Sequence, residues 1–152
     1  MRTIIIGCDN AGVGLKSILK KHMQEQDINV IDVGCDSSMD DTYYPYIAKK
    51  VCEKIIENNY KEDGLLICGT GLGMAMVANK FKGIRAAVCH DIFSVSRAKL
   101  SNNANVICMG ERVVGVEVAK RLLDEWLSLK FVDGSSTPKV QAILAIEDNN
   151  LR

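Results

Sequence analysis

The feature that most constrains the fold is a regular alternation between short apolar runs and stretches with helical spacing of apolar residues. The strand-length runs are Thr3–Cys8, Asn29–Val33, Gly64–Cys68, Arg85–Cys89 and Asn105–Met109. Helical patterns cover Val13–Glu25, Tyr44–Asn58, Gly73–Lys80, Ile92–Ser101, Val116–Leu129 and Pro138–Asn149. Strands alternating with helices indicate a parallel sheet covered on both faces. Right-handed crossovers then predict an α/β, Rossmann-like, doubly wound five-stranded sheet plus a C-terminal helix.

Length and charge limit the classes of function. The 152 residues predict a single domain over residues 1–152 with a sizeable core. Lys plus Arg and Asp plus Glu both number 19, and this balance argues against nucleic-acid binding. No apolar run approaches the roughly 20 residues that span a bilayer, and Thr3–Cys8 is too short for a signal peptide. We therefore expect a cytoplasmic protein with neither a nucleic-acid nor a membrane partner.

The six cysteines contain no CxxC pair, so reduced thiols and no zinc site are expected. Free cysteine is a commonly buried residue type, which favours a packing role for all of them except Cys68. The packing cysteines are Cys8, Cys35, Cys52, Cys89 and Cys108. His22 is expected to be solvated. His90 is either catalytic or, with more weight, a structural group.

The residues best suited to ligand binding and catalysis follow the third predicted strand. Open parallel sheets bind ligands at the carboxyl ends of their strands, and the segment Cys68–Met74 reads CGTGLGM. Three glycines in five positions between a strand and a helix let backbone N–H groups converge on an anion. Cys68 stands at the mouth of this loop, where a thiol can act as a base or nucleophile.

Two alternatives apply to the same loop. Gly69–Gly73 is G-x-G-x-G rather than the dinucleotide fingerprint G-x-G-x-x-G, and it follows the third strand rather than the first. The acidic residue expected about 20 residues later is also missing, so a nicotinamide or flavin site is disfavoured. A tight turn that merely packs the helix stays possible. Together with Cys68, the loop favours a small-anion site without a cofactor.

Two long segments, Ile67–Met74 and Ala78–Cys89, resemble the core signature of type B ribose-5-phosphate isomerases, which share a family with galactose-6-phosphate isomerase subunits. Shorter matches in the same order are Gly7–Asp9, Tyr44–Pro45, Asn105–Val106, Gly110–Gly115 and Ala142–Ile143. The resemblance covers nearly the whole chain. It implies a metal-free aldose–ketose isomerase of a sugar phosphate with a Rossmann-like fold. It also implies a homodimer or homotetramer whose sites lie between subunits.

The resemblance implies a role for each matching residue. Cys68 is the base that moves a proton between C1 and C2 of the open-chain sugar phosphate, Thr70 supports it, and Asp9 contacts substrate hydroxyls. The amides of Gly71 through Ala75 form the anion hole for the enediolate. Asn102 and Arg112 come from the adjoining subunit, with Arg112 toward the phosphate. The substrate-binding residues expected are Asn10, Gly69, Gly71, Gly73, Met74, Ala75, Ser101, Asn102, Arg112 and Lys139.

The chain departs from the family pattern in three ways. The residue after Asp9 is usually His and is Asn10 here, and the ring-opening His falls on Ser101. The phosphate-side Arg pair falls on Ser135 and Lys139. These changes bear on ring opening and phosphate binding, and so on ribose 5-phosphate itself, more than on isomerase chemistry.

Several functions follow from this pattern. The first is isomerisation of ribose 5-phosphate to ribulose 5-phosphate. The alternatives are isomerisation of galactose 6-phosphate or a tetrose 4-phosphate, a non-catalytic sugar-phosphate-binding companion subunit, and a dinucleotide-binding domain. Serine is a poor acid, so Ser101 predicts slow ring opening and a preference for substrates already in the open form. A tetrose 4-phosphate is such an open-form substrate. In the alternative, His90, Tyr46 or water opens the ring in place of the missing histidine.

Overall fold

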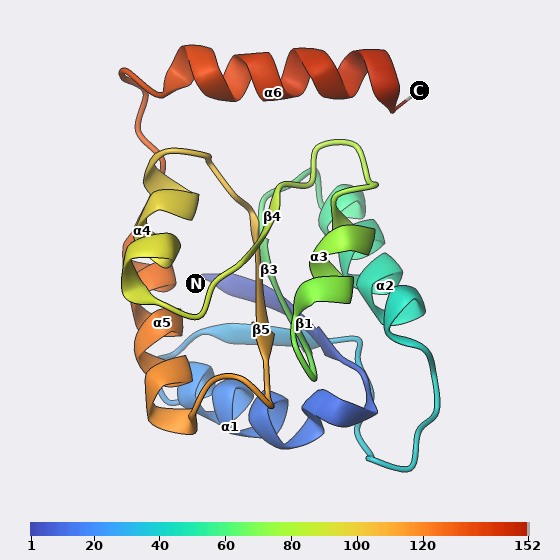
Figure 1. The fold of residues 1–152 in the computed structure, drawn as a ribbon. Helices are drawn as coiled ribbons and strands as arrows, with labels where there is room; N and C mark the ends of the chain where they lie inside the picture. Colours follow the sequence, from blue (N-terminus) through green and yellow to red (C-terminus); the bar gives the residue numbers. More distant parts are fainter. Residues whose placement is uncertain (152) are drawn as a thin grey trace.

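The computed structural model describes residues 1–151 and contains every predicted element (Figure 1). The strands are β1 Thr3–Cys8, β2 Asn29–Asp32, β3 Asp63–Cys68, β4 Ala86–Val88 and β5 Val106–Gly110. The helices are α1 Val13–Gln24, α2 Tyr44–Glu57, α3 Leu72–Ala78, α4 Ile92–Leu100, α5 Val116–Ser128 and α6 Thr137–Asn150. A short 3₁₀ turn, η1 Asn10–Gly12, was not expected from the sequence. It forms because the Asp9 carboxylate accepts the Ala11 N–H at 3.0 Å.

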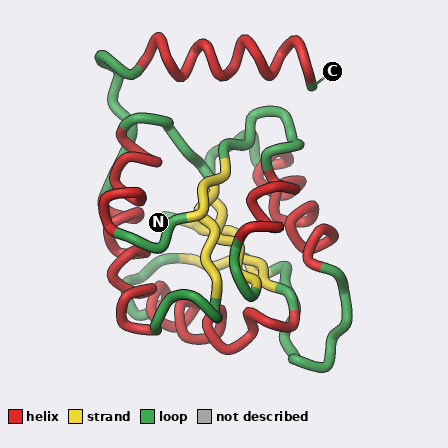
Figure 2. The backbone as a smooth tube through the Cα atoms, viewed as in Figure 1, coloured by secondary structure: helices red, strands yellow, loops and turns green. Residues whose placement is uncertain are grey.

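All strands pair in parallel in the order β2-β1-β3-β5-β4, which confirms the doubly wound sheet. Helices α2 and α3 cover one face, and α1, α4 and α5 cover the other (Figures 1 and 2). From β1 the chain first moves outward to β2 and then returns to the other side of β1 for β3. The carboxyl ends of β1 and β3 therefore form the switch point at which such sheets bind ligands.

The central strands are continuous apolar runs because both of their faces are buried. The prediction that five cysteines pack in the core is confirmed, since Cys8, Cys35, Cys52, Cys89 and Cys108 are all buried. Burial raises the pKa of the thiols of Cys8 and Cys52 to about 12. Burial likewise raises the pKa of Cys35 and Cys89 to about 11, so these thiols stay protonated near neutral pH.

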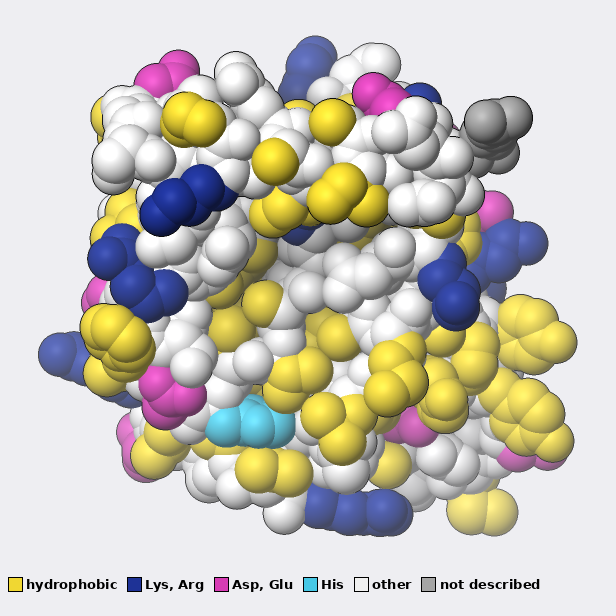
Figure 3. Space-filling view, turned by 45° about the horizontal axis from the view of Figure 1, so that its top comes forward, with side chains coloured by type: hydrophobic (Ala, Val, Ile, Leu, Met, Phe, Trp, Pro, Cys, Tyr) yellow, Lys and Arg dark blue, Asp and Glu magenta, His cyan; other side chains and the backbone are white. Residues whose placement is uncertain are grey.

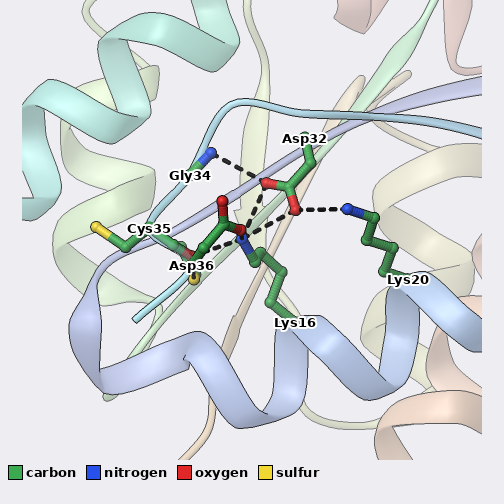
Figure 4. A network of polar contacts seen from close by, with 7 residues as sticks. Lys16, Lys20, Asp32, Gly34, Cys35 and Asp36 are labelled. Atoms are coloured by element: carbon green, nitrogen blue, oxygen red, sulfur yellow. Dashed lines mark hydrogen bonds and ion pairs between the residues drawn. The ribbon is translucent and has the colours of Figure 1, made fainter. Parts of the chain in front are cut away.

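An ionic cluster ties α1 to the carboxyl end of β2 (Figure 4). The buried Lys16 Nζ lies 2.9 Å from carboxylate oxygens of both Asp32 and Asp36 and donates to the Cys35 carbonyl at 2.5 Å. Lys20 adds a second ion pair to Asp32 at 3.1 Å. Burial opposes the charge on Lys16, but the bonds to Asp32 and Asp36 outweigh it and raise the pKa of the lysine.

A second cluster lies at the amino end of β3. The Asp63 carboxylate accepts from Lys99 Nζ at 2.5 Å, from Trp126 Nε1 at 3.1 Å and from Arg2 at 3.2 Å. The Lys99 ammonium also lies 4.1 Å from the centre of the Trp126 ring, a cation–π contact. Here burial outweighs the single carboxylate, and the pKa of Lys99 is lowered.

The prediction for His22 is wrong. Its Nε2 lies 2.7 Å from an Asp124 carboxylate oxygen, and the side chain is only 21% exposed. The histidine therefore joins α1 to α5 across the covered face of the sheet. The spacing of apolar residues predicts an exposed His22 on α1, but it does not predict that α5 packs beside it.

The edge strand β4 and helix α6 form the far side of the molecule. The Asn79 carboxamide pairs with both outward-facing backbone groups of Ala86, donating to its carbonyl at 2.9 Å and accepting from its N–H at 2.8 Å. Helix α6 lies beyond the amino ends of the strands (Figure 1). Its Val140 is buried, whereas Ile143 and Ile146 are exposed. None of the helices within residues 1–151 has the length and apolar character needed to cross a membrane.

Candidate active site

The glycine loop between β3 and α3 has a backbone that other residues would strain. Gly71 has φ +79°, in the left-handed region that favours glycine. A Cβ on Gly71 would lie 2.9 Å from the Met109 carbonyl carbon, so the loop packs directly on the end of β5. From the β5 side, a Cβ on Gly110 would lie 2.5 Å from Thr70 Cα. The two glycines allow backbone-to-backbone contact that fixes the position of the loop.

The start of α3 presents backbone donors. The first N–H groups of a helix lack intrahelical partners, here those of Gly71, Leu72, Gly73 and Met74. The Gly71 N–H donates to Cys68 Sγ at 3.0 Å, and the Leu72 N–H donates to Thr70 Oγ1 at 3.3 Å. Within residues 1–151 this leaves the amides of Gly73 and Met74 unpaired.

The donor geometry corrects the expected anion hole. The Ala75 N–H bonds the Gly71 carbonyl at 3.2 Å, so it belongs to the helix and is not free for a ligand. Of the N–H groups expected to face an anion, those of Gly73 and Met74 have no partner within residues 1–151, and that of Gly71 bonds the Cys68 sulfur. Thr70 steadies the helix start through Leu72 and keeps its hydroxyl proton available for donation.

A hollow of about 300 Å³ brings the central candidates together. Its lining is Asp9, Ala11, Tyr44, Cys68, Gly69, Thr70, Gly73 and Arg112. Cys68 is 5% exposed, so its thiol reaches this space from an otherwise buried strand end. Asp9 arrives from β1, and one carboxylate oxygen is held by Ala11. The other oxygen remains available to a bound hydroxyl.

Arg112 belongs to this hollow in its own chain, which contradicts the expectation that it arrives from an adjoining subunit. The backbone N–H of Arg112 donates to the Gly69 carbonyl at 3.0 Å. Its guanidinium Nη1 lies 3.2 Å from the point where a Gly69 Cβ would stand. Gly69 thus gives the guanidinium room to cross the loop. A cation beside free N–H donors and a thiol suits a substrate that carries a phosphate and a carbonyl.

Tyr44 is a site residue that the sequence did not single out. A Cβ on Gly73 would lie 2.5 Å from Tyr44 Cε2, so the ring covers the glycine and closes one side of the hollow. The available signal was the Tyr44–Pro45 pair at the start of α2. Tyr46, an expected ring-opening candidate, lies outside, 61% exposed and stacked on Tyr43 at 6.5 Å. Asn10 lines a neighbouring hollow of about 480 Å³ with Asp9 and residues 41–45.

His90 has a structural contact. Its Nε2 accepts the Gly110 N–H at 2.8 Å and so ties the end of β4 to β5. Burial lowers the pKa of this imidazole. The nitrogen that could take a proton is already used, which favours the structural interpretation of His90. Among residues 1–151, no group of three or more His, Cys, Asp or Glu side chains is placed to hold a metal ion.

Three expected binding residues lie away from the hollow. Ser101 caps the end of α4 and Asn102 follows it, both ahead of the amino end of β5. Strand β5 spans about 13 Å at ~3.3 Å per residue, which separates these residues from Cys68. Lys139 lies on α6, beyond the same end of the sheet (Figure 1). One chain therefore does not bring Ser101, Asn102 and Lys139 to its own Cys68.

Known proteins match this chain over nearly its whole length in sequence and fold. The model of the Ribose/Galactose Isomerase family matches residues 4–143. A D-erythrulose-4-phosphate isomerase 2 of Mycolicibacterium smegmatis is 50% identical over 95% of this chain and 96% of its own length. A D-erythrulose-4-phosphate isomerase of Pectobacterium atrosepticum is 43% identical, over 94% and 93%. A crystal structure of ribose-5-phosphate isomerase B from Mycoplasma genitalium with bound ribulose 5-phosphate matches with a TM-score of 0.92 and 33% identity, covering 97% of each chain.

Proposed function

The chain belongs to the ribose/galactose isomerase family and is a sugar-phosphate isomerase, and we propose that its substrate is a four-carbon sugar phosphate. The reaction interconverts a tetrose 4-phosphate and its ketose form. The observation that carries the proposal is Ser101 at the position of the family's ring-opening histidine. The names of two similar relatives, both D-erythrulose-4-phosphate isomerases, support the same substrate class.

The chemistry of ring closure explains the link between Ser101 and a tetrose. An aldopentose 5-phosphate closes a five-membered ring through its O4, and an acid must protonate the ring oxygen to open it. A tetrose 4-phosphate carries the phosphate on O4, so it has no such ring to open. An enzyme for tetroses therefore needs no imidazole at position 101. Neither His90, which is bound to Gly110, nor the outlying Tyr46 supplies a substitute acid at the hollow.

The proposed mechanism uses groups already at the hollow. Cys68, as the thiolate, takes the proton from the carbon next to the carbonyl, and the electron pair moves onto the carbonyl oxygen. The N–H groups of Gly73 and Met74 meet this developing charge, a contribution of about 10²–10³-fold per donor in other enzymes. The proton of the C2 hydroxyl then passes to the oxygen on C1, and the thiol returns its proton to C1, which leaves the carbonyl at C2 and restores the thiolate. Asp9 holds a substrate hydroxyl, and Arg112 holds the phosphate, which orients the reacting carbons.

The proposed site is completed by a second copy of the chain. Ser101, Asn102 and Lys139 lie at the opposite end of the sheet from Cys68, so they can serve only the hollow of a neighbour. Exposed Ile143 and Ile146 on α6 give that neighbour an apolar surface to cover. We expect a homodimer or homotetramer by light scattering, and a monomer with full turnover would contradict the shared site.

The substrate is tested by comparing kcat/KM for erythrose 4-phosphate and ribose 5-phosphate in the parent and in Ser101→His. The parent should favour the tetrose. The histidine variant should gain at least tenfold on ribose 5-phosphate and nothing on the tetrose, since a general acid contributes about 10²–10⁴-fold. Ser17→His, on an exposed position of α1, is the matched control. A parent that prefers ribose 5-phosphate, with no response to Ser101→His, would overturn the proposal.

A further inference from the structure

We propose that Arg85 is a positioning residue for the active site of a neighbouring copy, because it fixes the turn 101–103 relative to α6. These two segments carry Ser101, Asn102 and Lys139, which the proposed function assigns to that neighbouring site. The inference thus rests on the shared site and adds the residue that aligns its two distant parts.

The Arg85 side chain holds the turn through a hydrogen bond. Arg85 Nε donates to the Asn103 carbonyl at 2.6 Å. Asn103 has φ +49°, in the left-handed region that asparagine adopts more readily than most other non-glycine residues. The backbone N–H of Arg85 also donates to the Asn105 side-chain oxygen at 2.8 Å. Both bonds hold the C-terminal side of the turn, at Asn103 and Asn105, and so restrain Ser101 and Asn102 just before it.

The backbone N–H and carbonyl of Gly83 connect this turn to α6. Its carbonyl accepts from Asn105 Nδ2 at 2.8 Å and from Arg85 Nη1 at 3.4 Å. Its N–H donates to Glu147 Oε1 on α6 at 2.9 Å, beside a 2.8 Å ion pair between Lys82 and Asp148. Burial lowers the pKa of Arg85, and the carboxylate of Glu147 opposes that shift. The hydrogen bonds around Gly83 and Arg85 therefore hold both the turn 101–103 and α6.

The two segments face the same space. A hollow of about 540 Å³ lies between α6 and the body, lined by Asn102, Ala104 and Arg85 on one side and by Ile143, Ile146 and Glu147 on the other. The space-filling view shows apolar side chains along α6 above a recess (Figure 3). The occupant that fits the proposed function is a second copy, since Asn102 opens onto this hollow and not onto that of Cys68.

Arginine suits this junction for a geometric reason. Its guanidinium donates in several fixed directions at once and so reaches the carbonyls of both Asn103 and Gly83. A lysine keeps the charge but offers a single ammonium on a flexible stem. Arg85→Met should therefore lower kcat/KM about 10- to 100-fold, the usual range for losing charged hydrogen bonds. Arg85→Lys should also lower kcat/KM, while preserving the fold better than Arg85→Met.

The decisive experiment isolates heteromers of two differently tagged variants, Cys68→Ala and Arg85→Met, and assays erythrose 4-phosphate. If Arg85 acts on the neighbour, one site of each mixed dimer has an intact Cys68 and an intact partner Arg85. The heteromer should then regain about half of the parent activity, well above either variant alone. If Arg85 serves its own chain, no site is intact and activity stays at the level of the variants, which overturns the inference. Arg85→Lys repeats the test should the methionine variant unfold.

One further mixture separates the failure of this inference from the failure of the shared site. Cys68→Ala with Asn102→Ala tests the shared site itself. Restored activity in that pair, without it in the Arg85 pair, refutes only the positioning role. Failure of both pairs refutes the shared site and the inference together. Arg97→Met, on an exposed position of α4, is the control arginine and should retain parent activity as a homomer.

Discussion

The two ends of the sheet each hold a buried lysine, and the two lysines behave in opposite ways. At the carboxyl end, Lys16 has two carboxylates and a carbonyl, and its pKa is raised. At the amino end, Lys99 shares the single Asp63 carboxylate with Arg2 and Trp126, and its pKa is lowered. Both side chains are almost inaccessible to solvent, but burial outweighs the partners only at Lys99, where Asp63 is the single carboxylate and Arg2 and Arg85 add like charge.

The same contrast extends to function. The carboxyl end has N–H donors without partners beside a thiol and a guanidinium, so a ligand can be bound and transformed there. At the amino end, Asp63 already binds Lys99, Trp126 and Arg2, and what this end offers outward is a turn and a helix. In the proposed assembly the first end supplies the reaction and the second end completes the site of another copy.

The largest effect should come from Cys68→Ala, which removes the base at the reactive end. Turnover should fall by about 10²–10⁴-fold, and solvent deuterium should no longer enter at C2 of the substrate. Cys89→Ala is the control, because this buried thiol at the end of β4 has a raised pKa and no place in the hollow. Turnover above about a tenth of the parent in Cys68→Ala would remove Cys68 from this role.

The next effect compares the two lysines directly. Lys16→Met should reduce the free energy of unfolding by roughly 3 kcal/mol, the lower end of the range for breaking a buried ion pair, because Asp32 keeps Lys20. Lys99→Met should cost about 1 kcal/mol, since Asp63 keeps Arg2 and Trp126 and the methionine still packs on the ring. Urea unfolding measures both. A larger loss for Lys99→Met would reverse the comparison.

The pH dependence of these two contributions has opposite signs. The pKa of Lys16 in the folded state is raised, so its stabilisation is complete below the ordinary lysine range and disappears as the pH rises through the raised value. The pKa of Lys99 is lowered, so the folded state gains stability as the pH rises from that value to the ordinary one. The stability gap between the two variants should therefore be widest at neutral pH.

The smaller of the two effects on catalysis should come from Arg112→Met. Loss of the guanidinium should lower kcat/KM for the phosphorylated substrate about 10- to 100-fold, mainly through KM. Inorganic phosphate should also become a weaker competitive inhibitor. Arg121→Met, exposed on α5, is the control. An unchanged KM would place the phosphate elsewhere and remove Arg112 from the reactive end.

The fold could be predicted because each strand and helix carries its own periodicity, and the short parallel connections leave few arrangements. At the site, Cys68 and its glycines were predictable because they are contiguous. The lining role of Tyr44, the His22–Asp124 contact and the place of Arg112 depend on packing between distant segments, which spacing does not encode. The loss of Ala75 from the anion hole depends on one backbone bond.

The Asn79 carboxamide has a consequence for how copies of this chain can meet. It occupies both backbone groups that Ala86 turns away from the sheet, so an incoming strand finds no ladder to extend at that point. Edge-to-edge growth, the route by which exposed strands build fibrils, is hindered at Ala86 by this one side chain. In the proposed assembly, a neighbouring copy would then meet this point of the chain through side chains and not through a common sheet.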